Sequence, residues 1–97
     1  MDKESVVPES MASHASSAQP LGTLKRGARG IVTHITNLTT DPDLERQLLE
    51  IGLVEGVRVE LLHHGPFGDP VAVRIDQRLT VALRRTEANA VLVVPIA

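Results

Sequence analysis

Three successive segments of the chain alternate between apolar and polar residues, and this pattern constrains the fold more than any other feature. Such alternation is typical of antiparallel strands that have one buried face and one solvated face. The short step through Asp76 and Gln77 predicts a tight hairpin between the second and third segments. The apolar positions are Val57, Val59 and Leu61 in the first segment, Val71, Val73 and Ile75 in the second, and Leu79, Val81 and Leu83 in the third.

Two more strands are predicted outside these segments. Residues 29–35, "RGIVTHI", are rich in β-branched side chains and follow two glycines. Residues 90–96, "AVLVVPI", are apolar on both faces, as expected of a strand that closes a barrel.

One helix is predicted over residues 41–52. Leu44, Leu48 and Ile51 make one apolar stripe, and Thr40 or Asp41 can cap the first turn. Gly52 can take the left-handed conformation that ends a helix, with Leu53 folding back on Leu48. Five strands and this helix predict a mainly β fold, a small, partly open five-stranded barrel of the SH3-like kind with one inserted α-helix.

The composition indicates one domain preceded by a tail. A chain of 97 residues is of single-domain size. Residues 1–20 are rich in Ser and Ala without apolar periodicity, so we expect a disordered tail there and a folded domain over residues 21–97. The chain has no cysteine, which excludes disulfides and thiolate chemistry. The N-terminus lacks the apolar core of a signal peptide, and we expect a cytoplasmic protein without membrane insertion.

The sequence also carries a family resemblance. The helix end "LLEIGLVEGVRVELL", the turn "GPFGDP", and Leu83-Arg84 followed by Glu87-Ala88 occur in order along residues 21–97. This set resembles the ferrous iron transport protein A family, the FeoA-like domain. The resemblance implies an SH3-like barrel and, for a stand-alone domain, a cytosolic partner of the membrane ferrous-iron permease, whose cytosolic end carries a G-protein domain.

The turn "HHGPFGDP" holds the candidate site. Pro66 and Gly68 favour a stiff bend, and Asp69 can bond to its own backbone ahead of Pro70. Phe67 is the only aromatic residue of the chain, so it either plugs the barrel or anchors a partner. We therefore expect a partner contact at the turn, with a second contact at Leu53 if its packing leaves it accessible. The candidate partner-binding residues are Leu53, Pro66, Phe67, Gly68 and Asp69.

A metal site is the main alternative. His63 and His64 are adjacent, but neighbouring residues of a strand point to opposite faces and chelate one ion poorly. Further ligands would have to come from His34 or Asp69. We expect no resident metal or cofactor, and a ferrous-ion sensor built on His63, His64 and Asp69 stays as the alternative function.

Other functions have less support in the sequence. No catalytic arrangement of Ser, His or acidic residues stands out, so we expect no enzyme. Proline-rich ligands would need an aromatic groove that this chain cannot build. Residues 21–97 hold nine acids and nine bases, which disfavours nucleic acid despite a group of arginines on two strands, although a small RNA-binding barrel stays as a second alternative. The free edges of such a barrel would also allow pairing into a homo-oligomer.

Overall fold

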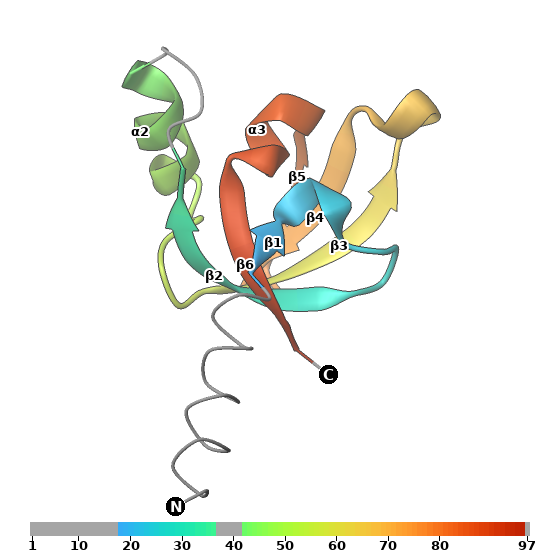
Figure 1. Cartoon of the computed structure of the whole chain (residues 1–97), viewed down its shortest axis with the longest axis horizontal. Helices are drawn as coiled ribbons and strands as arrows, with labels where there is room; N and C mark the ends of the chain where they lie inside the picture. Colours follow the sequence, from blue (N-terminus) through green and yellow to red (C-terminus); the bar gives the residue numbers. More distant parts are fainter. Residues whose placement is uncertain (1–17, 37–41, 97) are drawn as a thin grey trace, which may run out of the picture.

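The protein is described by a computed structural model that covers residues 18–36 and 42–96. The strands in these residues are β1 (Gln19–Pro20), β2 (Arg29–Ile35), β3 (Arg58–His64), β4 (Val71–Ile75), β5 (Leu79–Leu83) and β6 (Val91–Ile96). The helices are α2 (Pro42–Glu50) and α3 (Arg85–Asn89), with short 3-10 turns η1 (Leu21–Thr23) and η2 (Pro66–Gly68). The strands form one bent antiparallel sheet in the order β1-β6-β2-β3-β4-β5 (Figure 1).

The sheet confirms the mainly β class and corrects two details of the prediction. Gln19 and Pro20 pair with Val93 and Leu92 of β6, so the sheet has a sixth strand and the domain begins before residue 21. The two edge strands, β1 and β5, do not pair with each other, so the barrel stays open and β6 lies between β1 and β2 instead of closing it. The rest of the predicted tail, residues 1–17, lies outside the described residues.

The hairpin between β4 and β5 forms where the alternation predicted it. Asp76 and Gln77 have φ angles of 56° and 59°, and the N–H of Arg78 donates to the carbonyl of Ile75 at 3.0 Å. Two successive positive φ angles define a type I′ turn, whose twist matches that of the strands it joins. In the ladder beyond the turn, Ile75 pairs with Leu79, so Arg78 lies between the turn and the first paired residue of β5.

The C-terminal end of α2 also follows the prediction. Gly52 has a φ of +107°, and its N–H donates to the carbonyl of Leu49 at 3.0 Å. The N–H of Leu53 donates to the carbonyl of Leu48 at 3.1 Å. These two bonds are those of a Schellman motif, which explains why a glycine ends this helix. The predicted caps Thr40 and Asp41 lie outside the described residues.

The helix α3 was not predicted. Its entry is stabilised by Glu87, whose side chain accepts a hydrogen bond from the backbone N–H of Arg84 at 2.8 Å. Ala88 is fully buried, so the helix closes one side of the core. The segment is short and has no apolar stripe, and the Glu at the third helical position was the one signal available.

The core is one aliphatic cluster between the concave side of the sheet and the helices. Within the described residues no polar or charged residue is buried, so burial of apolar surface holds the fold together. No helix in the described part of the chain is long and apolar enough to cross a membrane. The largest fully buried side chains are Leu21, Val32, Leu53, Val59, Leu61, Val71, Val73, Val91 and Val93.

Candidate functional site

The turn between β3 and β4 is closed by its own backbone hydrogen bonds. The N–H of Gly65 donates to the carbonyl of Pro70 at 2.7 Å, and the N–H of Gly68 donates to the carbonyl of Gly65 at 2.9 Å. A Cβ at position 65 would lie 2.8 Å from the carbonyl oxygens of both Asp69 and Pro70, so only glycine fits there. Figure 1 shows this turn projecting at the tip of the β3–β4 hairpin, on the opposite side of the molecule from α2. The loop is therefore held in one shape before any partner arrives.

Phe67 stands at the tip of this turn and points into solvent. Phe67 is 98% exposed, which rules out the alternative in which it plugs the barrel. Its φ of 59° lies in the left-handed region that a bulky L-residue rarely adopts, and Gly68 follows with a φ of 80°. A fully exposed aromatic ring contributes nothing to core packing. Strained backbone conformations such as this one concentrate at functional sites.

Asp69 holds the turn against the following part of the chain. Its Oδ1 accepts a hydrogen bond from the backbone N–H of Arg85, the first residue of α3, at 3.0 Å. The sequence predicted that this carboxylate bonds to the backbone of its own turn, and that partner is wrong. Asp69 still braces the loop, through α3. Sequence reasoning missed Arg85 because a backbone N–H at the start of a short helix leaves no mark in the side-chain pattern.

Leu53 is not part of an exposed site. It is 0% exposed and belongs to the core cluster together with Leu48. Its Schellman packing uses the whole side chain, so the expectation of a second partner contact at Leu53 is wrong. The candidate contact set reduces to Pro66, Phe67, Gly68 and Asp69.

The histidines do not converge with the other proposed metal ligands. His64 Nε2 lies 3.1 Å from the carbonyl oxygen of Gly22, and His34 Nδ1 lies 3.3 Å from the hydroxyl of Thr33. Asp69 bonds to α3. Among residues 18–36 and 42–96, no three His, Asp or Glu side chains are grouped so that they could hold a metal ion.

The arginines on β4 and in the β4–β5 turn are partly neutralised. Arg74 pairs with Glu60 at 3.4 Å, and Arg78 pairs with Asp76 at 3.9 Å. The Arg78 pair is largely solvated and contributes little to stability, whereas the Arg74 pair is part-buried. Glu60 and Asp76 therefore offset part of the arginine charge.

Comparison with known proteins identifies the family. The FeoA domain model matches residues 19–95, which is most of the chain and begins at β1. The chain belongs to the FeoA domain family. The resemblance seen in the sequence is thereby confirmed, and the association of this FeoA domain with ferrous iron transport follows at the level of the family.

Two solved FeoA structures are similar to this one. The FeoA protein of Chlorobium tepidum superposes with a TM-score of 0.70 and 33% identity, over 80% of this chain and 70% of that chain. The FeoA of Stenotrophomonas maltophilia, solved in complex with zinc, superposes with a TM-score of 0.66 and 31% identity, over 75% of this chain and 86% of that chain. The latter is described as a prokaryotic SH3 domain protein, which confirms the SH3-like fold.

A FeoA-like fold also occurs inside a larger protein of another kind. A manganese-dependent transcriptional repressor in complex with manganese superposes with a TM-score of 0.73 and 30% identity, over 81% of this chain and 37% of that chain. No curated protein matched the sequence. Similar domains therefore serve in different settings, and the function of this chain has to be argued from its own surface.

Proposed function

We propose that this FeoA domain is a non-enzymatic, cytoplasmic accessory protein of ferrous iron uptake, which contacts the cytosolic, G-protein-bearing part of the ferrous iron permease. The contact residues are those of the β3–β4 turn, with Phe67 as the anchor. The observation that carries the proposal is the 98% exposure of Phe67 on a turn that is already ordered by hydrogen bonds.

Preorganisation of the turn supports this contact. A partner that covers Phe67 would gain the burial of a large aromatic surface, and rigid aromatic side chains are common among residues that dominate binding energies. The turn is closed by the bonds of Gly65 and Gly68 and held by Asp69. Little conformational entropy would then be lost on binding.

The family membership supports the choice of partner, and a relative from Stenotrophomonas maltophilia is described as a proposed ferrous iron transport activating factor. The direct test is calorimetric titration of the purified permease cytosolic domain with the full chain. Saturable binding is expected, and Leu49→Ala should leave it unchanged, because Leu49 is an exposed apolar residue on α2, away from the turn. Absence of binding to that domain would refute the proposal.

A further inference from the structure

The two edges of the sheet differ in how well they are protected. The edge strand β1 has two residues and contains Pro20, which cannot donate to a new strand. The opposite edge strand, β5, runs over Leu79–Leu83 without a charge, a proline or a bulge. Native sheets usually protect an edge by such features, so β5 is an edge that is open to pairing.

The backbone groups that β5 offers can be deduced from the ladder. The N–H of Asp76 donates to the carbonyl of Arg58 on the β3 side. In an antiparallel ladder such bonds alternate, so the odd-numbered residues of β4 bond toward β5. These pair with Leu79, Val81 and Leu83. The N–H and C=O groups of Thr80 and Ala82 therefore point away from β4, and both residues are exposed.

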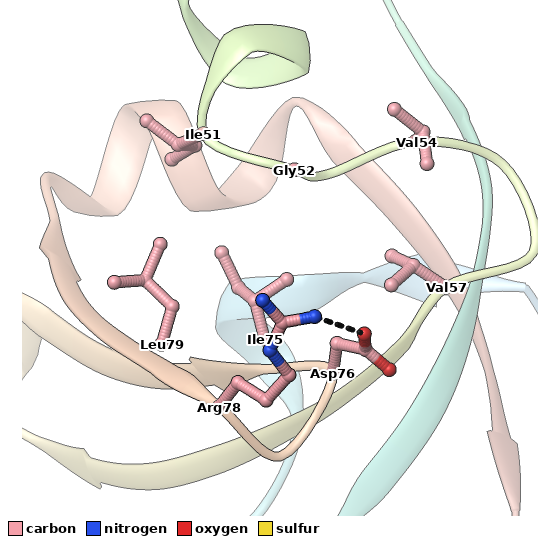
Figure 2. Close-up of a pocket in the computed structure, with 8 residues that line it drawn as sticks. All are labelled: Ile51, Gly52, Val54, Val57, Ile75, Asp76, Arg78 and Leu79. Carbon is pink, nitrogen blue, oxygen red and sulfur yellow. Dashed lines mark ion pairs between the residues drawn. The ribbon is translucent and has the colours of Figure 1, made fainter.

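An apolar groove runs along β5 on the side that faces α2. It consists of two hollows of about 490 and about 300 Å³, and Ile51 at the end of α2 lines both. In Figure 2, Ile51 and Val54 lie on one side of the larger hollow and Leu79 lies on the other. Val54 and Leu79 remain 44% and 46% exposed. We call this surface the β5 groove; its apolar lining includes Leu48, Ile51, Val54, Leu79, Val81 and Leu83.

We propose that the free edge of β5 and the β5 groove together bind an extended segment of a partner protein. The segment adds a strand to the sheet through Thr80 and Ala82, and its alternate aliphatic side chains enter the groove. Side chains of an added strand alternate in the same phase as those of β5, so every second one lies on the side of Leu79 and Val81.

The charges around β5 indicate which charge the partner segment should carry at its two ends. Arg78 stands just before the strand, with its side chain 82% exposed and Asp76 3.9 Å away, and Arg84 and Arg85 follow the strand on exposed positions. The strand between them carries no charge. A partner segment with an acidic residue at each end therefore complements this edge, while basic ends would meet like charge.

A second copy of this chain fits the edge less well. Two antiparallel β5 strands would form hydrogen bonds with all the free backbone N–H and C=O groups of Thr80 and Ala82 in only one register. That register places Thr80 opposite Ala82 of the other copy. That register sets Arg78 opposite Arg84 at both ends of the pair, where like charges repel. The charges thus favour a different protein over self-association, independently of whether the Phe67 turn binds the permease.

The proposal can be tested with the capped peptide Glu-Val-Thr-Val-Thr-Val-Glu. Paired antiparallel to the edge, it places one residue opposite each residue from Arg78 to Arg84, with Glu opposite each arginine. Added to the ¹⁵N-labelled full chain, it should give saturable amide shifts at Thr80 and Ala82 at about 1 mM or below. The same peptide with Lys at both ends should bind about tenfold more weakly or worse. No saturable shift in this range, shifts confined to other residues, or equal binding of the Lys peptide would overturn the proposal.

Two protein variants locate the site. Thr80→Pro removes one free N–H without removing any hydrogen bond to β4. It should weaken binding of the acidic peptide about tenfold. If the melting curve shows that Thr80→Pro does not fold, Leu79→Lys replaces it as the test. Leu79→Lys places a charge in the groove at a half-exposed position and should weaken peptide binding similarly. Phe67→Ala should bind the peptide like the wild type. Unchanged binding by a folded groove variant, or a wild-type dimer in sedimentation that Thr80→Pro dissolves, would contradict the proposal.

Discussion

The carboxylate of Asp69 and the backbone N–H of Arg85 are joined by a hydrogen bond of 3.0 Å, which ties the β3–β4 turn to the start of α3. The bond connects the exposed loop to an element whose Ala88 is buried in the core. A charged acceptor at the N-terminal end of a helix is also favoured by the helix dipole. The orientation of Phe67 is thus set by the rest of the fold as well as by its own turn.

Asp69→Ala should lower the free energy of unfolding by about 1 kcal/mol, because the N–H of Arg85 loses its acceptor. Asp69→Asn keeps an acceptor oxygen and serves as the matched control, with a smaller loss. Chemical denaturation measures both. Equal stability of Asp69→Ala and the wild type would show that the bond does not brace the turn.

Leu53→Ala should lower the free energy of unfolding by about 2–5 kcal/mol, since it empties a fully buried position of the core. Leu49→Ala removes the same atoms from an exposed position and should cost far less. Denaturation curves of the two variants separate core packing from surface effects. A small loss for Leu53→Ala would mean that Leu53 is accessible after all.

The double substitution of His63→Ala and His64→Ala should leave ferrous iron uptake largely intact. His64 lies against the carbonyl oxygen of Gly22 at 3.1 Å, and no third ligand of the described chain joins the pair. Uptake is measured in cells that depend on this chain for ferrous iron. Loss of uptake by a variant that still folds would support the ferrous-sensor function instead.

Deleting residues 1–17 should shift the thermal midpoint by less than about 2 °C, because their composition lacks an apolar pattern that could add to the core. Deleting residues 1–20 also removes β1, with its pairs to Val93 and Leu92, and should destabilise the domain. A large shift from the shorter deletion would show that the first 17 residues contribute to the fold.

Local patterns predicted most of the fold. Alternation identified β4 and β5, because a two-residue period follows directly from the geometry of a strand. Gly52 predicted the end of α2 because few residues other than glycine tolerate its φ of +107°. Two elements were missed, since Gln19–Pro20 and Arg85–Asn89 are too short for either period to appear.

The site was less predictable than the fold. The turn around Phe67 could be found because proline and glycine mark it in the sequence. Whether Phe67 was a core plug or an exposed anchor depends on the direction of one side chain, which no periodicity encodes. The β5 groove depends on how α2 and β5 face each other across the core, and that is a tertiary relationship between residues far apart in sequence.

Titration of the permease cytosolic domain with the wild type and with Phe67→Ala, together with their melting curves, tests the central claim most directly. Phe67 is 98% exposed, so the melting midpoint should stay within about 2 °C. The affinity should fall about tenfold or more, equivalent to about 1–2 kcal/mol of binding free energy. An unchanged affinity of the folded variant would contradict the account of the turn as the recognition site.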